Sequence, residues 1–355
     1  MGLQKLREFI ASRGLDGFLV TNPENRRYLS GFTGSAGVLL ITPDSAYIAT
    51  DFRYYEQVAR ECPSFVLVKV EKQFADVLPK MLDEAKVKVL GFESPYLTVE
   101  EYRKWRRLTR KVKWVPCEDI VGKIRSVKSP QEIQTIRRAV SLADEAFHHI
   151  CQVLRPGMSE KEAAWEIEHF MRTHGADKVA FDLIVASGPN GALPHARASD
   201  RIIKEGEPVV IDIGCVVDGY CSDLTRTVVL GRADERFREV YSVVLKAQDK
   251  AERAIKAGMR ARRADSIARR VIEKAGYGPH FGHGLGHGIG LNVHEKPTVG
   301  KASGDILQSG NVITVEPGIY LPGWGGVRIE DVVLVREDGV EILTRSPKGL
   351  EFAVL

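Results

Sequence analysis

The feature that most constrains the fold of this chain is an internal repeat in its C-terminal two thirds. A shift of 101 residues places Gly157-Met158 on Gly258-Met259 and Gly175 on Gly276. Apolar positions at helical spacing match under the same shift, and chance would produce some of those matches. The glycines match as well, and this favours a true repeat over chance. Two helical repeats without a gap predict a pseudo-twofold domain, in which each half is a pair of helices followed by strands.

Two helix starts in the repeat carry a complete capping signal. In Ser129-Pro130-Gln131-Glu132, the serine can cap a helix, proline suits the first helical position and the glutamate closes a capping box. This helix is predicted to run to about Leu154. A second box at residues 159–162 opens the next helix, which Gly175 ends.

The first third of the chain alternates short apolar runs with amphipathic stretches. A length of 355 residues favours two domains over one. The expected strands are residues 17–20, 37–41 and 46–49, and the expected helices are residues 3–13, 52–60, 74–85 and 99–108. We therefore predict an α/β domain over residues 1–122 and a second domain over residues 123–355.

Composition and charge exclude several classes of protein. The net charge of +4, from 51 basic and 47 acidic residues, is too small and too scattered for binding nucleic acid, and the arginines between residues 260 and 270 fit a solvated helix face. The five cysteines form no CxxC pair and fit free thiols in a reducing compartment. We expect no signal peptide, because residues 1–20 lack its apolar stretch and small-residue cleavage site, and no apolar run is long enough to span a bilayer. We expect a cytoplasmic protein without nucleic-acid or membrane partners.

Two aspartates interrupt apolar strands. Residues 209–214 have the pattern of a buried strand that contains Asp212, and Asp218-Gly219 is a hairpin turn signal. If the turn lies there, Asp223 sits opposite Gly214 and diagonal to Asp212 on the same face. A carboxylate in an apolar strand is costly unless it is paired or bound to a cation. The hairpin indicates either a metal site or a pair of satisfied structural aspartates.

Four of the nine histidines fall within fifteen residues, and they are His280, His283, His287 and His294. The glycines between them argue against a helix, so the His-x-x-x-His spacing here is not the helical zinc motif. Glycine also lets backbone approach a site closely. The cluster therefore favours a functional site over isolated structural histidines.

Two later strands add three acids. Residues 312–318 form a predicted strand that ends in Glu316 before a Pro-Gly break, and residues 326–332 carry both Glu330 and Asp331. The pattern alone does not say which of Glu330 and Asp331 faces the site.

Taken together, these acids and one histidine resemble the pita-bread metallopeptidases, which include methionine aminopeptidase, aminopeptidase P and prolidase. The resemblance covers nearly the whole chain. It implies an α+β pita-bread catalytic domain that follows an α/β, creatinase-like N-terminal domain. It also implies five metal ligands, and it selects Glu330 rather than Asp331. These ligands are Asp212, Asp223, His287, Glu316 and Glu330.

The same resemblance implies roles for further residues. Glu316 also shuttles a proton, and His294 steadies the tetrahedral intermediate. His195 and His283 line the substrate pocket, and Arg328 and Tyr320 orient the ligands.

The charge of the implied ligands indicates the cofactor. Two carboxylates about 4 Å apart repel by roughly 4 kcal/mol at an effective dielectric constant near 20. Two divalent cations would cancel the four carboxylate charges. A ligand set of oxygens with one imidazole suits Mn²⁺ and also admits Co²⁺, Fe²⁺ or Zn²⁺.

Residues 28–35 and Leu193-Pro194-His195 look like the Xaa-Pro branch of this family. The resemblance implies hydrolysis of the Xaa-Pro bond at the N-terminus of small peptides by a homodimer. The glycine-rich residues 31–41 favour aminopeptidase P, which accepts longer peptides, over prolidase, which is limited to dipeptides. A non-catalytic binding protein is the distant alternative, although such relatives usually lose ligands.

Substrate length depends on whether an arginine binds the free carboxylate of a dipeptide. Arg328 adjoins the ligand Glu330 and is expected to be committed there. Arg197 can face either the pocket or solvent. Without a dedicated carboxylate site, we expect tripeptides to be cut at rates within roughly tenfold of dipeptides.

Overall fold

The computed structural model describes residues 2–355 and divides into two compact units between Arg125 and Ser126. The sequence places this boundary after residue 122. Each unit is described by itself below. Within the described residues, every helix is too short or too polar to cross a membrane.

The first unit is built on a six-stranded sheet with the order β4-β3-β2-β1-β5-β6. β2 pairs antiparallel with β1 and β3, whereas the other pairs are parallel. The strands are β1 (Gly17–Val20), β2 (Val38–Ile41), β3 (Ala46–Asp51), β4 (Val66–Val70), β5 (Val89–Glu93) and β6 (Lys113–Cys117). The helices are α1 (Gly2–Ser12), α2 (Pro23–Ser30), α3 (Tyr55–Glu61), α4 (Phe74–Glu84), α5 (Val99–Leu108) and α6 (Ile120–Ser126), with the 3₁₀ turn η1 (Phe52–Tyr54) before α3.

Helices cover both faces of this sheet. Phe18 and Val20 of β1 pack in one core with side chains of α1, α2, α3 and α6. Leu19 packs on the opposite face with side chains of α4 and α5. Because successive side chains of a strand point to opposite faces, a continuous apolar run is buried on both sides. The predicted α/β class of this unit is confirmed.

The sequence patterns described above do not predict β4, β5, β6 or α2. The signals for α2 are of the same kind as those of the helix that starts at residue 130. The Asn22 side chain accepts a hydrogen bond from the Asn25 N–H, and Pro23 occupies the first helical position. Asn22-Pro23 is therefore a signal in the sequence that predicts the start of α2.

The second unit contains two helix pairs and several small sheets. The helices are α7 (Pro130–Val153), α8 (Glu160–Thr173), α9 (Glu235–Ala254) and α10 (Ala261–Lys274), with 3₁₀ turns η2 (Gly188–Ala192), η3 (Gly278–His280) and η4 (Leu350–Phe352). The strands of the first half are β7 (Lys178–Val179), β8 (Ile184–Ser187), β9 (Pro208–Ile213), β10 (Cys215–Val217), β11 (Tyr220–Cys221) and β12 (Leu224–Val229). Those of the second half are β13 (Gly286–Gly288), β14 (Glu295–Val299), β15 (Val312–Val315), β16 (Gly318–Leu321), β17 (Gly325–Arg328), β18 (Asp331–Val335) and β19 (Val340–Ile342).

The predicted repeat is confirmed in the helices of this unit. The bounds of α8 and α10 differ by 101 residues at both ends, and α7 and α9 end at Val153 and Ala254, which differ by the same number. Gly157 and Gly258, in the turns between the paired helices, have φ angles of 97° and 80°. Glycine adopts this left-handed conformation without the steric cost that other residues meet.

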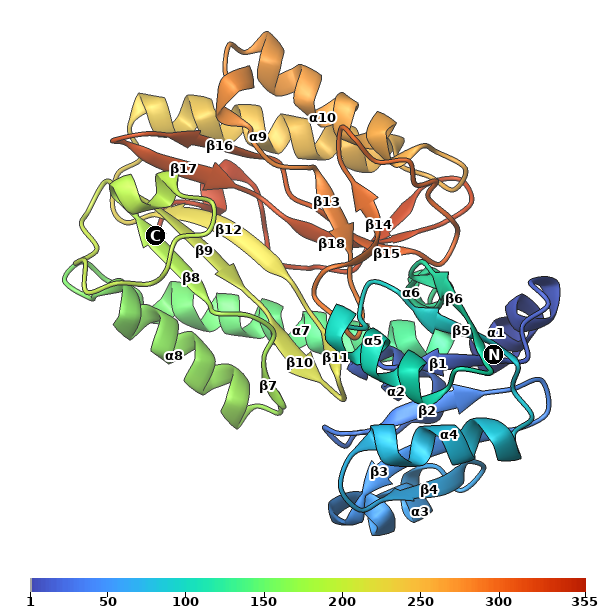
Figure 1. Cartoon of the computed structure of the whole chain (residues 1–355). Coiled ribbons are helices and arrows are strands. Elements are labelled where there is room, and N and C mark those ends of the chain that lie inside the picture. The colour runs from blue at the N-terminus through green and yellow to red at the C-terminus, as the bar shows by residue number, and fades with distance from the viewer. Residues whose placement is uncertain (1) are drawn as a thin grey trace. The chain divides into compact units, whose positions relative to one another are not determined.

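The strands repeat in the same way. β8, β9 and β12 form an antiparallel sheet with the order β12-β9-β8, and β18, β15 and β13 are adjacent in the matching order within a five-stranded sheet. Figure 1 shows α7 and α8 on one side of the strands of this unit and α9 and α10 on the other. The pseudo-twofold architecture predicted from the repeat is therefore present.

The capping box of α7 generates a first prediction. The Ser129 hydroxyl accepts a hydrogen bond from the Glu132 N–H, and the Glu132 carboxylate accepts one from the Ser129 N–H. Ser129→Ala should lower the free energy of unfolding by about 1 kcal/mol, because an N–H group loses its partner. The melting temperature, measured by calorimetry, should fall by about 2–4 °C. Ser129→Thr keeps the hydroxyl and should retain most of the stability, and an unchanged melting temperature in Ser129→Ala would contradict the prediction.

Candidate active site

The alternation of side chains along β9 decides where Asp212 points. Val209, Ile211 and Ile213 pack in the apolar core that contains side chains of α7 and α8. Asp212 lies between Ile211 and Ile213, so its side chain points to the opposite face of the strand. An apolar strand therefore holds one carboxylate in the interior of the unit.

The hairpin after β9 brings in Asp223. Asp218 and Gly219 have positive φ angles of 49° and 81°, as a tight hairpin turn of this kind requires. The pairs Val217 with Tyr220 and Ile213 with Leu224 share one register, which places Asp223 opposite Gly214. The predicted turn and register are confirmed. A Cβ atom at Gly214 would lie 2.3 Å from the Ser222 carbonyl oxygen, so only glycine fits there.

The second half of the repeat supplies acids at matching places. Glu316 follows the last residue of β15, as Asp212 lies near the end of β9. Glu330 immediately precedes β18, as Asp223 immediately precedes β12. Each half thus contributes one carboxylate at the end of its middle strand and one before the next strand of the repeat.

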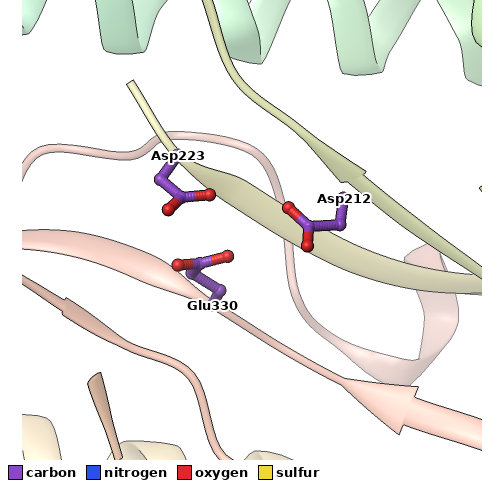
Figure 2. A group of neighbouring side chains, drawn as sticks. All are labelled: Asp212, Asp223 and Glu330. Carbon is purple, nitrogen blue, oxygen red and sulfur yellow. The ribbon is translucent and has the colours of Figure 1, made fainter. Parts of the chain in front are cut away.

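Three of these carboxylates converge. Asp212, Asp223 and Glu330 each offer an oxygen, and these oxygens lie within 4.8 Å of one another. Figure 2 shows the three carboxylates pointing toward a common centre. The Asp212 Oδ1 atom is buried without a hydrogen-bond partner among the described residues. An unpaired buried oxygen within a group of carboxylates is what a divalent cation binds, and the donor set fits one.

The protonation of the cluster reflects its crowding. Burial is the main cause that raises the pKa of Glu330 to about 8, and the charges of Glu316 and Asp212 add to it. Burial and the charge of Glu330 also raise the pKa of Asp223 well above its usual value. The pKa of Asp212 is raised by burial, which the neighbouring Arg328 opposes. These acids therefore reduce their mutual repulsion by holding protons, which a bound cation would replace.

His287 presents one ring nitrogen to the acids. It lies on β13 rather than on a helix, and its Nδ1 atom is 3.1 Å from the Gly288 carbonyl oxygen, to which it can only donate. In the neutral ring the Nε2 lone pair is then free, and Nε2 lies 3.3 Å from Glu316 Oε1 and 3.7 Å from Asp223 Oδ2. Burial disfavours the charged ring, but Glu316 outweighs it and raises the pKa of His287. Burial raises the pKa of Glu316. The hydrogen bond to His287 and the charge of that ring lower it by more, so the pKa of Glu316 falls to about 2.

Arg328, Tyr320 and His283 form a hydrogen-bonded chain beside the acids. Arg328 donates to Asp212 Oδ2 at 2.6 Å and to the Tyr320 hydroxyl at 2.8 Å. His283 Nδ1 donates to the Gly284 carbonyl at 2.8 Å, so Nε2 of the neutral ring accepts a hydrogen bond from the Tyr320 hydroxyl at 2.9 Å. The chain fixes both the Asp212 carboxylate and the His283 ring.

The remaining predicted histidines are more exposed. His294 is exposed, and its ring centroid is 4.3 Å from that of His287. Partial desolvation and the neighbouring His287 lower the pKa of His294, and nearby His195 contributes. His195 itself is exposed. His280, the fourth member of the sequence cluster, lies on η3, and its described hydrogen bond is to Tyr277 rather than to a site residue.

Two features of the site were missed or left open by the sequence. Asp331 turns away from the cluster, since its carboxylate pairs with Arg226 and Lys348. Thr225 was not identified, although its hydroxyl donates to Glu330 at 2.7 Å and accepts from Arg328 Nε at 3.1 Å. Its pairing opposite Asp212 in the predicted hairpin was the available signal.

A hollow of about 450 Å³ adjoins His283. Its lining includes Lys296, Thr298 and Lys301. Lys296 lies 3.3 Å from Asp305, whereas Lys301 is exposed and has no ion pair among residues 2–355. The hollow is therefore a positively charged space next to a residue of the candidate site.

Two known protein families match this chain. The creatinase/prolidase N-terminal domain matches residues 3–127. Metallopeptidase family M24 matches residues 134–337, more than half of the chain. This chain belongs to metallopeptidase family M24. It is an enzyme of the peptidase class, and the predicted pita-bread architecture is confirmed.

Similar M24 proteins extend over almost the whole chain. It is 40% identical to the Xaa-Pro dipeptidase of Pyrococcus horikoshii, with 98% of each chain covered. A structure of an Xaa-Pro dipeptidase from Bacillus anthracis has a TM-score of 0.96 at 42% identity, covering 100% of this chain and 99% of the other. A structure of an X-Pro aminopeptidase from Thermotoga maritima has a TM-score of 0.89 at 41% identity, covering 96% and 98%.

Membership of M24 implies divalent metal ions and generates a second prediction. Mn²⁺ added to chelator-treated protein should raise the melting temperature, because a ligand that binds only the folded state stabilises it by about 2.7 kcal/mol at 100 times its dissociation constant. Asp223→Asn should reduce this shift, because it removes a charge from the cluster. Asp218→Asn, at the exposed hairpin turn, is the matched control and should preserve it. An equal shift in Asp223→Asn and wild type would contradict the assignment.

Proposed function

We propose that this chain is a dinuclear metallopeptidase that hydrolyses the Xaa-Pro bond of dipeptides. The observation that carries the proposal is its similarity, over at least 98% of its length, to proteins named Xaa-Pro dipeptidase. From the sequence, the glycine-rich residues 31–41 and the lack of an evident arginine for the substrate carboxylate favour an aminopeptidase. The dipeptidase, its alternative, has the broader support.

An Xaa-Pro aminopeptidase is the second candidate, favoured by the 41% identity to the Thermotoga maritima protein. The two activities break the same bond and differ in whether the substrate ends at proline. A dipeptidase gains by binding the free carboxylate, which a longer peptide lacks at that position.

The hollow beside His283 supports the dipeptidase. An exposed cation such as Lys301 suits a carboxylate at the end of a short substrate. Arg197, considered for the same task from the sequence, is exposed and remains a candidate. Both are proposed contacts for the substrate carboxylate.

The proposed metal ligands are Asp212, Asp223, His287, Glu316 and Glu330. Bound cations would polarise the scissile carbonyl and lower the pKa of a water molecule. The converging carboxylates and the His287 Nε2 atom, which faces Glu316 Oε1 at 3.3 Å, support this assignment. The metal identity stays a prediction, with Mn²⁺ first and Co²⁺, Zn²⁺ or Fe²⁺ admitted by the same donors.

The other residues of the site move protons and hold the substrate. Glu316, whose pKa is lowered, is ionised at neutral pH and is proposed to accept a proton from the attacking water and pass it to the proline nitrogen. His294 lies beside His287 and is proposed to donate a hydrogen bond to the developing oxyanion. His195 and His283 are proposed to line the pocket. Arg328 and Tyr320 hold Asp212 and His283 in place.

Acceptance of proline requires a site that does not depend on a hydrogen-bond donor at the scissile nitrogen. The amide before proline has no N–H, so a site that depends on hydrogen bonding to that group rejects this bond. A site that binds the proline ring by apolar contacts instead loses no hydrogen bond at this position.

The third prediction concerns substrate length. An Xaa-Pro dipeptide should show kcat/KM at least about tenfold above an Xaa-Pro-Yaa tripeptide, which corresponds to about 1.4 kcal/mol of carboxylate recognition. Lys301→Ala or Arg197→Ala should raise KM for the dipeptide and leave the tripeptide unaffected. Tripeptides cut within tenfold of dipeptides, as first expected from the sequence, would assign the chain to the aminopeptidases.

The fourth prediction concerns His294. His294→Ala should keep both metals, measured by elemental analysis, while kcat falls roughly 10²-fold or more, the scale of one oxyanion donor. His287→Ala is the comparison and should lose metal. Loss of both metals from His294→Ala would show that this histidine is a ligand.

The homodimer and the cytoplasmic location rest on family resemblance and composition, and they stay predictions. A mass near 39.4 kDa in light scattering at micromolar concentration would remove the dimer.

A further inference from the structure

Glu330 lies at a break between strands. β17 ends at Arg328 and β18 begins at Asp331, so the regular ladder does not fix the peptide of Glu330. Its N–H donates to the Thr225 carbonyl at 3.0 Å, and its carboxylate accepts from the Thr225 hydroxyl at 2.7 Å. Its carbonyl oxygen still needs a donor in the buried interior.

Arg226 supplies that donor. Its side chain is 2% exposed, and its Nη1 atom donates to the Glu330 carbonyl. Its Nη2 atom donates to Asp331 Oδ1 and to the Ser346 carbonyl, both at 2.7 Å. Its Nε atom donates to the Pro347 carbonyl at 3.2 Å. One guanidinium therefore ties the strand break to a segment near the C-terminal end.

A second cation completes the network. Lys348 Nζ lies 2.6 Å from Asp331 Oδ2 and 2.7 Å from Glu252 Oε2. Gln248, fully buried on α9, donates to both the Val315 carbonyl and Asp331 Oδ2. Val315 immediately precedes Glu316. The network thus contacts backbone next to both carboxylates of the second half of the repeat.

Stability alone is a weak explanation for such a network. Packed apolar residues can often replace a buried ion pair without loss of stability. Apolar side chains could not, however, donate to the Glu330 carbonyl or fix the direction in which its carboxylate points. Metal ligands depend on partners of this kind for their orientation.

We propose that Arg226, Asp331 and Lys348 form a largely buried ionic clamp that positions Glu330 for metal binding. These are positioning residues, which act through Glu330. The inference rests on the proposed metal site and is independent of which peptide is cut.

The test measures Mn²⁺ affinity by calorimetric titration of chelator-treated, folded protein. Lys348→Met should weaken binding of at least one Mn²⁺ tenfold or more, and Lys348→Arg, which keeps the charge, should recover most of it. Asp331→Asn should weaken it similarly. The matched control is Arg201→Met, because Arg201 pairs with Glu207 in the same unit and its side chain is 23% exposed, against 22% for Lys348.

Melting temperatures separate positioning from general damage. The clamp predicts that Lys348→Met loses Mn²⁺ affinity while Arg201→Met keeps it within twofold, at comparable losses of melting temperature. Wild-type affinity in folded Lys348→Met, or equal loss in Arg201→Met, overturns the clamp. If Asp331→Asn does not fold, the Lys348 variants still decide. Wild-type protein that binds Mn²⁺ without cutting Xaa-Pro peptides overturns the proposed function alone, and wild-type protein that binds no divalent metal overturns both.

Discussion

Repulsion among buried carboxylates is the constraint on which the second unit depends. Asp212, Asp223 and Glu330 bring oxygens within 4.8 Å of one another, where each pair of full charges would repel by roughly 4 kcal/mol. The side chains stay close together because burial and these charges raise the pKa of Asp223 and of Glu330, which favours their protonated forms. The arrangement therefore requires either protons or cations, together with a fold rigid enough to hold the side chains in place.

That rigidity comes from duplication. Both halves of the repeat use a helix pair on one side of an antiparallel sheet, and both deliver acids at the end of the middle strand and before the next. Because the odd-numbered residues of β9 are anchored in the helix-covered core, Asp212 has only the inner face available. A single sheet would supply half of the carboxylates, and the two halves together complete the set.

Arginine and lysine side chains outside the carboxylate cluster balance part of its negative charge and that of the neighbouring Asp331. Arg328 holds Asp212 directly and, through Tyr320, fixes the His283 ring. On the other side, Arg226 and Lys348 surround Asp331, next to Glu330. Neighbouring acids in the sequence thus have opposite tasks. Glu330 faces the cluster, whereas Asp331 ties its strand to α9 and to the segment near the C-terminal end.

The sequence by itself determined the features that depend on local spacing. The repeat at 101 residues, the cap at Ser129 and the Asp218-Gly219 turn follow from glycines, caps and apolar periods within short windows. The register of one hairpin then places Asp223 diagonal to Asp212, because a two-residue turn leaves no freedom in the pairing. Family resemblance, rather than pattern, supplied the choice of Glu330 and the roles of the histidines.

Only the tertiary structure decided the contacts between the two halves of the repeat. Thr225 and Glu330 are 105 residues apart in the chain, as are Arg226 and Asp331, and no local pattern specifies that they meet. Alternation predicts that Glu330 and Asp331 face opposite ways but not which of them faces the acids. That choice depends on how one sheet packs against the other, which is fixed by burial of the shared core and by the buried charges that each half must satisfy in its partner.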